Sequence, residues 1–473
     1  MSKNITVRHK KVLLVGLGRL GGGVAAARFF VEQGARLTVS DALTKDILRP
    51  SLNKLKYLPI KYELGIKTPT HISGYDMVVC NQAISINSEV VRLVKKARIP
   101  YFNDFTTLLN LLEKTPHRPY IGVTGTRGKT TVTTWIGHLI KPSIVGGNMP
   151  RNGSFTIFNK IKNKPNLPVA LELSSFQLEY VQKGMEPPRV AVVTNLYQDH
   201  LNRHGTMEEY ARCKANLFIN QSSKDVLILN ADDAYTKKFL SFKPKATVWM
   251  VSRKKLSKGM WGMYEQKGIC YLQDASGVRE IIHVPEGFKD HQIYNLMEAL
   301  CAARAYGREW SSIVKRIATL PQIPFRQQIV LQTKKYVVIN DSAATSPEGA
   351  VAAIRAHVPE DGAYAYICGG TDKQLDFSIL ARTIKEKVNP KKIFLLQGSG
   401  TQKLIEALKK EKYNFITDHI FETLEELVLS VRRNTPRGII IFSPACASFE
   451  KFKNEFHRGR QFTKLVKRYF AKN

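Results

Sequence analysis

Apolar runs of four or five residues alternate with longer amphipathic stretches from one end of the chain to the other. In the first part, apolar runs at 11–15, 36–40 and 77–80 accompany a helical stretch that reaches Phe30. Short, fully apolar strands separated by helices are typical of parallel sheets that are covered on both faces. This part therefore predicts a doubly wound sheet that ends near residue 115.

The same alternation continues through the rest of the 473 residues, which are too many for one hydrophobic core. Residues 249–283 depart from it, because turn residues separate short apolar runs and predict a small β insertion. We predict an α/β protein with three domains: a Rossmann-like domain at 1–115, a central P-loop-type domain with a parallel sheet at 116–322, and a C-terminal Rossmann-like α/β domain at 323–473. The predicted strands of the last two domains are 119–123, 169–173, 190–194, 225–229, 336–340, 365–368, 392–396 and 438–442.

Basic residues outnumber acidic ones by 72 to 39, which gives a formal net charge of +33. Such a charge is common in proteins that bind nucleic acid or an anionic membrane surface. Here the lysines and arginines are spread over the whole length, without a basic tail or a zinc-finger pattern, so we expect no nucleic-acid partner. A polyanionic small-molecule substrate accounts for the charge equally well.

The six cysteines are far apart and form no C-x-x-C pair, which predicts reduced, mostly buried thiols. The first residues lead into a strand without an apolar signal core, and no run of about 18 apolar residues occurs. We therefore expect a cytoplasmic protein without membrane insertion.

A glycine-rich turn, VTGTRGKTT at 123–131, lies between the predicted strand 119–123 and a predicted helix at 131–140. Glycines allow a backbone to wrap phosphate oxygens, Lys129 supplies positive charge, and the hydroxyl of Thr130 suits Mg²⁺. The commoner spacing would place a glycine where Val123 stands, and an ordinary glycine turn is the alternative. We interpret the turn as a triphosphate cradle, because strand, helix, lysine and threonine agree.

A second glycine pattern, GLGRLG at 16–21, follows the first predicted strand, and Asp41 lies twenty residues after Gly21. This spacing is typical of a dinucleotide site, in which the acid contacts a ribose, and favours an NAD-dependent dehydrogenase. The same turn can hold any nucleotide pyrophosphate, so the pattern leaves the ligand open.

Two groups of candidate metal ligands follow the triphosphate turn. Glu172 ends an apolar strand and can complete a Mg²⁺ site begun by Thr130. Asp199 and His200 end the next strand, and with Lys214 they can form a second metal centre. An ordinary ammonium would repel a metal, so Lys214 needs a modification or another partner.

Three further polar segments, at 340–346, 369–373 and 443–448, end predicted strands of the last domain. One crevice can hold them, because the carboxyl ends of parallel strands meet at one edge. Asp341 and Arg326 are candidates for nucleotide contacts, whereas Lys373 and Ser448 are candidates for gripping a small acid. Each can also be a turn or a helix cap.

Taken in order, these motifs resemble the Mur ligases over essentially the whole chain. The resemblance implies a UDP-binding first domain, a central ATP-binding domain and an amino-acid-binding C-terminal domain, and it replaces the NAD interpretation of the first turn. It also implies that Val123 belongs to the family's own form of the loop. The motifs that carry it are GTRGKT (125–130), ELSSFQ (172–177), Asp199-His200 with Lys214, HQIYN (291–295), Phe325-Arg326, NDS (340–342) and SPACAS (443–448).

The resemblance implies a role for each matching residue. Lys129, His200 and Lys214 would be catalytic. Two Mg²⁺ ions would be held by Thr130, Glu172, His200 and a carbamylated Lys214. ATP would contact Gly125, Thr126, Arg127, Gly128, Lys129, Thr130, Thr131, Asn295, Arg326 and Asp341. The substrates would contact Gly18, Arg19, Leu20 and Asp41 at the UDP end, Asn148, Ser174 and Gln177 at the muramoyl group, and Thr345, Lys373 and Ser448 at the amino acid.

The chain most closely resembles the branch of the family that adds D-glutamate to UDP-N-acetylmuramoyl-L-alanine. This resemblance implies a role in peptidoglycan precursor synthesis, with an acyl phosphate formed from ATP as the intermediate. It also implies a monomer. Two segments depart from that branch: DSAATS (341–346) lacks the usual lysine of DSKATN, and Asn81-Gln82-Ala83 replaces Ser-Pro-Gly. Three alternatives stay open. The first is a related ligase for another amino acid, including L-glutamate, the second is a folylpolyglutamate-type ligase, and the third is a basic nucleic-acid-binding ATPase.

Overall fold

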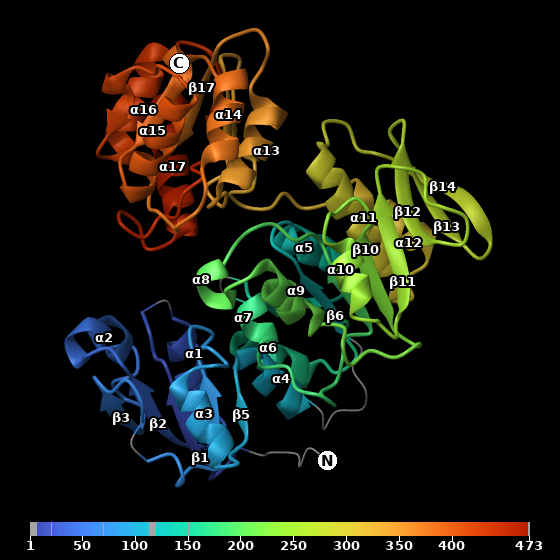
Figure 1. Ribbon diagram of the computed structural model, residues 1–473, viewed down its shortest axis with the longest axis vertical. Coiled ribbons are helices and arrows are strands. Elements are labelled where there is room, and N and C mark those ends of the chain that lie inside the picture. The colour runs from blue at the N-terminus through green and yellow to red at the C-terminus, as the bar shows by residue number, and fades with distance from the viewer. Residues whose placement is uncertain (1–6, 20, 70, 113–119, 150–151, 472–473) are drawn as a thin grey trace. The chain divides into compact units, whose positions relative to one another are not determined.

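The computed structural model describes residues 7–19, 21–69, 71–112, 120–149 and 152–471. The chain divides into two compact units, Met1–Pro321 and Gln322–Asn473. Within the described residues, the first unit holds a five-stranded and a nine-stranded sheet and the second holds a six-stranded sheet (Figure 1). These three largely parallel sheets confirm the predicted α/β class, whereas the predicted boundary after residue 115 lies outside the described residues.

The first sheet is parallel throughout, in the order β3-β2-β1-β4-β5. Its predicted strands are present, and β3 is an additional strand whose half-exposed residues IKYEL lack the apolar signal. The strand order reverses between β1 and β4, where parallel sheets bind ligands at the strands' carboxyl ends. The elements are β1 (Lys11–Val15), α1 (Gly22–Glu32), β2 (Arg36–Asp41), α2 (Lys45–Leu52), β3 (Ile60–Leu64), β4 (Met77–Cys80), α3 (Glu89–Lys96), β5 (Tyr101–Phe102) and α4 (Asp104–Leu112).

The central sheet has the order β14-β13-β12-β11-β10-β9-β6-β8-β7. It is parallel from β7 to β12, and β13 is antiparallel to both of its neighbours, β12 and β14, which confirms the predicted β insertion. Its strands are β6 (Tyr120–Thr124), β7 (Ile144–Gly147), β8 (Val169–Glu172), β9 (Val190–Val193), β10 (Val226–Asn230), β11 (Thr247–Ser252), β12 (Trp261–Gln266), β13 (Ile269–Asp274) and β14 (Gly277–His283). Its helices are α5 (Lys129–Leu139), α6 (Ser154–Asn163), α7 (Ser175–Leu178), α8 (Leu201–His204), α9 (Met207–Ala215), α10 (Thr236–Ser241), α11 (Asp290–Ala305) and α12 (Trp310–Ile317).

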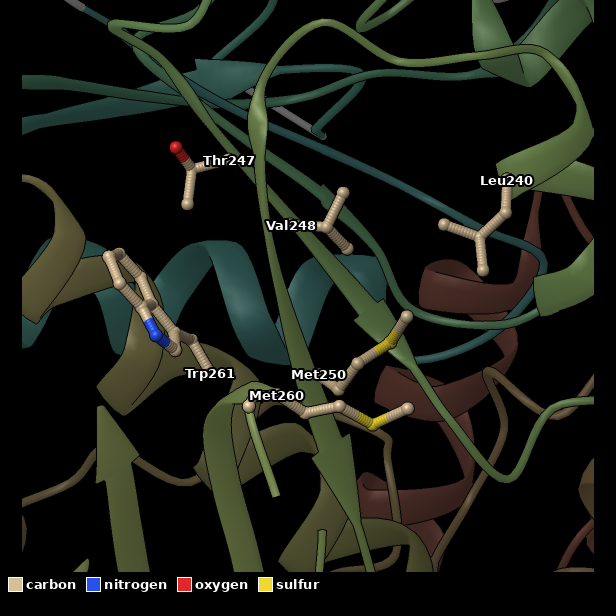
Figure 2. Close-up of a pocket in the computed structure, with 7 residues that line it drawn as sticks. Leu240, Thr247, Val248, Met250, Met260 and Trp261 are labelled. Carbon is tan, nitrogen blue, oxygen red and sulfur yellow. The ribbon is translucent and has the colours of Figure 1, made fainter. Parts of the chain in front are cut away.

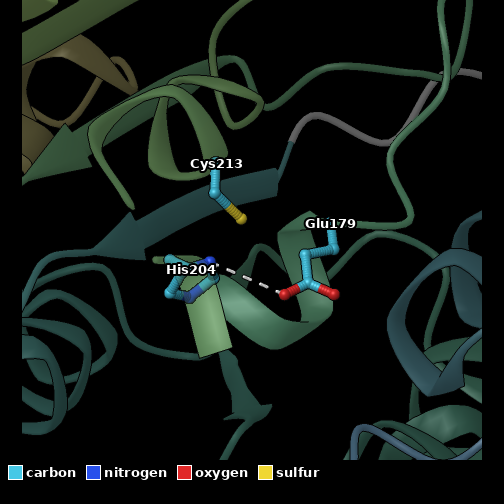
Figure 3. A group of neighbouring side chains, drawn as sticks. All are labelled: Glu179, His204 and Cys213. Atoms are coloured by element: carbon cyan, nitrogen blue, oxygen red, sulfur yellow. Dashed lines mark ion pairs between the residues drawn. The ribbon is translucent and has the colours of Figure 1, made fainter. Parts of the chain in front are cut away.

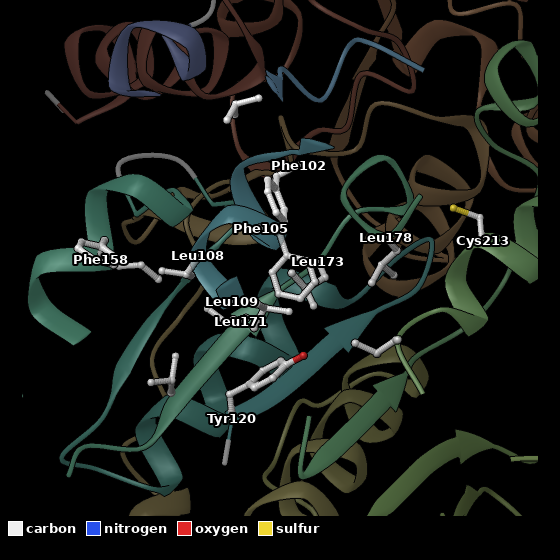
Figure 4. Close-up of a cluster of buried hydrophobic side chains, with 14 of the residues drawn as sticks. Phe102, Phe105, Leu108, Leu109, Tyr120, Phe158, Leu171, Leu173, Leu178 and Cys213 are labelled. Carbon is white, nitrogen blue, oxygen red and sulfur yellow. The ribbon is translucent and has the colours of Figure 1, made fainter. Parts of the chain in front are cut away.

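One continuous hydrophobic cluster runs through both sheets of the first unit. Phe105 of α4 and Tyr120 of β6 meet edge to face within the part shown in Figure 4. Phe29 of α1 packs against Phe158 of α6 with ring centroids 4.9 Å apart. Because buried aromatic rings contribute large apolar areas, this cluster holds the two sheets together as one unit.

The sheet of the second unit has the order β15-β16-β20-β17-β18-β19, in which only β15 is antiparallel to its neighbour. Strands β16, β17 and β20 lie side by side, so the three polar segments predicted after them leave the sheet at one edge. The elements are β15 (Gln328–Gln332), β16 (Tyr336–Asn340), α13 (Pro347–His357), β17 (Tyr364–Cys368), α14 (Ser378–Lys387), η1 (Pro390–Lys392), β18 (Ile393–Leu396), α15 (Ser399–Lys410), η2 (Thr417–His419), β19 (Ile420–Phe421), α16 (Leu424–Asn434), β20 (Gly438–Phe442) and α17 (Glu455–Phe470).

All six cysteines are buried and take part in no disulfide, which agrees with the prediction of buried thiols. Among the described residues, every helix is too short or too polar to span a bilayer.

Candidate active site

The triphosphate turn leaves β6, which lies between β8 and β9 in the sheet, and opens into α5, as the sequence predicts. Two of its glycines have left-handed backbones, with φ of 141° at Gly125 and 82° at Gly128. A Cβ at Gly125 would lie 2.0 Å from Thr194 Oγ1, and one at Gly128 would lie 2.5 Å from Asn295 Oδ1. Only glycine therefore fits either position, and Asn295 of α11 lies against the turn, next to the residues with which it is predicted to bind ATP.

The amine of Lys129 turns back into the loop. It donates hydrogen bonds to the carbonyl oxygens of Gly125 at 3.0 Å and Thr126 at 3.1 Å. Burial of the amine, reinforced by the charge of Lys214, lowers the pKa of Lys129 to about 8, whereas Glu172 opposes this shift. The lysine is thus held where an anion's oxygens would meet the loop.

Thr130 and Glu172 are brought together from α5 and the end of β8. The threonine hydroxyl donates to Glu172 Oε2 at 2.7 Å, and Glu172 is only 4% exposed. A hydroxyl and a carboxylate are the oxygen ligands that Mg²⁺ prefers. The pair fits the metal that was predicted here.

Lys214 is 1% exposed and donates from Nζ to the carbonyl oxygen of Gly125 at 2.9 Å. Its amine also lies 4.4 Å from the centre of the Tyr210 ring. Burial lowers the pKa of Lys214 to about 7, although Cys213 and Asp199 oppose the shift. The lowered pKa favours the uncharged amine, which repels a metal less than an ammonium does.

Asp199 connects the triphosphate turn to His200. Its Oδ2 accepts from Arg127 Nη1 at 3.2 Å, and its Oδ1 accepts from the backbone N–H of His200 at 2.9 Å. The His200 ring meets the Phe176 ring edge to face, with centroids 4.9 Å apart. Asp199 thereby connects the His200 segment to Arg127 of the turn.

Ser174 and Gln177 form a capping box at the start of α7. Gln177 is fully buried, and its Nε2 donates to Asp104 Oδ2 at 2.8 Å. The neighbouring Asn148 follows β7 and donates its backbone N–H to the Glu172 carbonyl at 2.7 Å. The three predicted muramoyl contacts thus lie at the ends of β7 and β8.

In the first sheet, Asp41 is buried and ties the GLGRLG turn to β2. Its carboxylate accepts from the backbone N–H of Gly18 at 2.9 Å and of Leu43 at 2.8 Å. Asn81, which stands where the D-glutamate branch has serine, donates from Nδ2 to the Gly16 carbonyl at 3.1 Å. It therefore also supports the turn. Arg19 is exposed, and Leu20 lies outside the described residues.

The polar segments of the second unit meet at one sheet edge. Asp341 accepts from Ser443 Oγ at 2.8 Å, and Lys373 Nζ donates to Thr345 Oγ1 at 3.3 Å. The hydroxyl of Ser448 is buried and has no hydrogen-bond partner among the described residues, which suits a ligand contact. Arg326 lies close enough to Asp341 to lower its pKa, but burial dominates and raises that pKa to about 7.

Three residues that are not among the predicted site residues also contribute to the site. Asn195 accepts the backbone N–H of Arg127 at 2.8 Å, and Tyr210 places its hydroxyl 3.3 Å from Thr126 Oγ1. Asp104 accepts from Gln177 and, at 2.9 Å, from Ser154 Oγ. In sequence, Asp104 looks like a helix start, and only the packing of α4 against α6 and α7 brings it to Gln177, a predicted substrate contact.

A separate surface pocket of about 310 Å³ lies beside α10, β11 and β12 (Figure 2). None of the predicted site residues lines it. The lining residues are Leu240, Thr247, Val248, Met250, Gly259, Met260 and Trp261.

Comparison with known proteins identifies the relatives of this chain. Residues 123–303 match the family described as "Mur ligase middle domain". The UDP-N-acetylmuramoylalanine–D-glutamate ligase of Roseiflexus sp. (strain RS-1) is 33% identical, over 97% of this chain and 99% of the relative. The chain belongs to the Mur ligase family. A ligase of the same name from Pelotomaculum thermopropionicum is 32% identical over 98% of this chain and 99% of its own length.

Solved Mur ligases share the fold. UDP-N-acetylmuramate-alanine ligase MurC from Thermotoga maritima aligns with a TM-score of 0.60 and 18% identity, over 98% of this chain and 100% of that chain. MurF ligase from the same organism, solved with ADP, aligns with a TM-score of 0.56 and 15% identity over 100% of both chains. The three-domain α/β architecture of the Mur ligases is therefore that of this chain.

We predict that Gly125→Ala weakens ATP binding at least about tenfold, because a Cβ cannot fit beside Thr194 without moving the turn. Calorimetric titration with ATP measures the change. Gly153→Ala is the matched control, since Gly153 has an ordinary backbone and a Cβ there would meet only one atom, at 4.0 Å. Equal affinities of the Gly125 variant and the wild type would contradict the assignment of the turn.

Asp341 gives a second prediction, for stability against pH. Its pKa is raised from 3.8 to about 7 in the folded protein, so the unfolded chain loses this proton at lower pH than the folded chain. This carboxyl therefore makes the unfolding free energy fall as the pH rises from about 4 to about 7. Asp341→Asn is expected to reduce that fall, as measured by urea unfolding followed across this range. The same pH slope in both proteins would rule out the buried acid as its source.

Proposed function

We propose that this Mur ligase joins D-glutamate to UDP-N-acetylmuramoyl-L-alanine in an ATP-dependent, ADP-forming reaction of peptidoglycan precursor synthesis. The observation that carries the proposal is the full-length similarity to ligases whose names state that substrate and that amino acid, with 33% identity over 97% of this chain in one of them. The site supports the same reaction class, because a triphosphate turn, a hydroxyl–carboxylate pair and a buried lysine meet at one end of the central sheet.

The chemistry consists of two displacements. An oxygen of the alanine carboxylate attacks the γ-phosphorus of ATP, and ADP leaves with the electrons of the broken P–O bond. The amine of glutamate then attacks the acyl carbon, inorganic phosphate leaves, and the amine gives up a proton. In the first step Lys129 places its charge beside the moving phosphoryl group, while the backbone of 125–130 holds the phosphate oxygens.

Mg²⁺ fits the oxygen ligands of Thr130 and Glu172, and His200 is the proposed ligand of a second ion. When bound, Mg²⁺ offsets the negative charge that the phosphates and the carboxylate bring together. Arg127 and Asp199 hold the His200 segment against the triphosphate turn, so the two ligand groups stay near each other.

We propose that Lys214 is carbamylated. Its uncharged amine attacks the carbon of CO₂ and releases one proton, which leaves a carbamate with a negative charge in place of the ammonium. Its near-complete burial and its pKa near 7 favour the uncharged amine that this reaction requires. The carbamate is an oxygen ligand for the metal, whereas the ammonium is a repulsive neighbour.

The three domains divide the substrates. We propose that 1–115 binds the UDP end through Gly18, Arg19, Leu20 and Asp41, that 116–322 binds ATP and the muramoyl group, and that 323–473 binds glutamate through Thr345, Lys373 and Ser448. This division takes the place of an NAD site at the first glycine turn. We further propose a cytoplasmic monomer without a nucleic-acid partner.

This chain lacks the lysine of the D-glutamate pattern, but another lysine supplies a positive charge nearby. Ala343 stands where that branch has lysine, but Lys373 places its amine 3.3 Å from Thr345 Oγ1 at the same sheet edge. One ammonium therefore still faces the proposed glutamate site, which supports an acidic amino acid.

The function is tested by a substrate panel. Phosphate release is expected only when ATP, Mg²⁺, UDP-N-acetylmuramoyl-L-alanine and D-glutamate are all present, because the acyl phosphate must form before the amine can attack. Phosphate release that does not depend on the UDP substrate would refute the reaction. Turnover with L-glutamate at the same rate would refute the D-specific proposal and leave the reaction class standing, and stimulation by RNA or DNA that salt abolishes would favour a nucleic-acid-dependent ATPase.

The role of Lys214 is tested by replacement. Lys214→Ala is expected to reduce turnover by about a hundredfold or more, because the negative ligand is lost, and added short carboxylates such as acetate are expected to restore part of it. The rate of phosphate release measures both effects. Lys238→Ala, at a partly exposed lysine paired with Glu208, is the control and should leave the rate unchanged. An active Lys214→Ala variant would remove the residue from the site.

A further inference from the structure

Glu179, His204 and Cys213 form a cluster that lies beside the proposed active site and has no part in the reaction above (Figure 3). Their ligand atoms lie within 4.8 Å of one another, as in many metal sites. The carboxylate is already occupied, however, because Arg203 donates from Nε to Glu179 Oε1 at 2.9 Å and from Nη2 to Oε2 at 2.8 Å. A metal would have to displace a bidentate guanidinium, so the cluster is better explained as a support for Arg203.

The other donors of Arg203 reach into the first sheet's domain. Its Nη1 donates to the carbonyl of Ala83 at 2.7 Å, and its Nη2 lies 2.9 Å from the carbonyl of Ile84 and 3.3 Å from that of Gln82. Glu179 Oε2 in turn accepts the backbone N–H of Ile86 at 3.2 Å. The pair therefore holds the backbone of residues 82–86, which we call the β4–α3 segment, with four contacts.

The β4–α3 segment adjoins the turn that is proposed to bind UDP. It leaves β4, which pairs with β1, so it begins beside the point where the GLGRLG turn leaves the sheet. Asn81, one residue before the segment, donates to the Gly16 carbonyl at 3.1 Å. Asn81 therefore connects the turn directly to the segment that Arg203 holds.

On its other side, Arg203 contacts the residues around His200. The guanidinium lies 4.8 Å from the centre of the Phe176 ring, and the same ring meets the imidazole of His200 edge to face. Arg203 and His200 also belong to the same short segment, since the backbone N–H of Arg203 donates to the His200 carbonyl at 2.9 Å and α8 begins directly after His200. The arginine side chain is 12% exposed and Glu179 is 7% exposed, so water does not replace these contacts easily.

We propose that Arg203 is a positioning residue that couples the UDP-binding turn to His200, with Glu179 holding its guanidinium. The proposal rests on the proposed function. Binding energy from the uridine diphosphate end is then used to place His200 and Phe176 at the carboxylate that reacts, which is the way remote binding energy raises the rate of a chemical step.

The coupling is tested without turnover by amide hydrogen exchange, with UDP alone as the probe. In the wild type, UDP is expected to slow exchange both in the β4–α3 segment and in residues 200–204. In Arg203→Lys, which keeps the charge but loses the fork that reaches three carbonyls, protection is expected in the first region only. Glu179→Gln, which keeps a side-chain acceptor, is expected to weaken the second protection partly. Absence of protection at 200–204 in the wild type, or equal protection in the Arg203→Lys variant, would overturn the proposal.

Kinetics give a second readout that a purely structural role would not move. Two substrates are compared: UDP-N-acetylmuramoyl-L-alanine and the same compound with a phosphate in place of UDP. The ratio of their kcat/KM values measures how much the uridine end raises the rate. We expect Arg203→Lys to lower this ratio about tenfold, by reducing kcat/KM for the full substrate and not for the truncated one. An equal loss with both substrates would contradict coupling.

Arg189→Lys is the matched control, because Arg189 forms a more exposed ion pair with Asp225 at the opposite ends of the strands, and its ratio should stay at the wild-type value. Melting temperatures of all variants separate loss of coupling from loss of fold. A wild type that is inactive on the full substrate would refute the proposed function, whereas the exchange experiment would still decide the coupling.

Discussion

The carbonyl oxygen of Gly125 accepts hydrogen bonds from two lysines, and the arrangement of the central site depends on this convergence. Two amines that approach one oxygen cannot both keep a full charge in a buried place at low cost. Burial accordingly lowers the pKa of Lys129 to about 8 and that of Lys214 to about 7. The more deeply buried of the two is also the one whose conversion to an anion would suit the neighbouring ligands.

Around this point the chain is held by side chains rather than by regular secondary structure. Thr194 lies so close to Gly125 that the turn has no room for a Cβ, and Asn195 accepts the backbone N–H of Arg127. Asp199 then passes the constraint from Arg127 to His200. All three residues follow β9, so the segment after the neighbouring strand supports the shape of the proposed phosphate site.

The sequence predicts those parts of the molecule whose cause is local. The apolar runs of β1, β6 and β20 are recognisable because both faces of a parallel sheet are buried, and α5 begins at Lys129, two residues before its predicted start. The half-exposed strand β3 gives no such signal. The candidate residues of each strand end are also local, because motif and strand are contiguous.

What the sequence does not reveal depends on contacts between distant segments. Asp104 reads as an ordinary helix start, yet packing of α4 places its carboxylate against Gln177, 73 positions away. In the sequence, Arg203 is one of many dispersed basic residues. Only the fold shows that its guanidinium contacts Glu179 beside the central sheet and the backbone of Ala83 beside the first sheet. The roles proposed for the ligand-binding residues come from family resemblance, since spacing alone left an NAD site, a turn and a cap as open alternatives.

The antiparallel extension of the central sheet has a consequence for the behaviour of the protein in a crowded solution. β14 is an outer strand, and an outer strand with free backbone groups is a template on which a second polypeptide can add. Arg279 and Glu280 lie on this strand and are exposed, and its pairing with β13 is interrupted by a bulge near Cys270. The charged side chains and the bulge at this edge strand oppose edge-to-edge pairing with another chain. The insertion therefore ends the long sheet with an edge that is protected from aggregation.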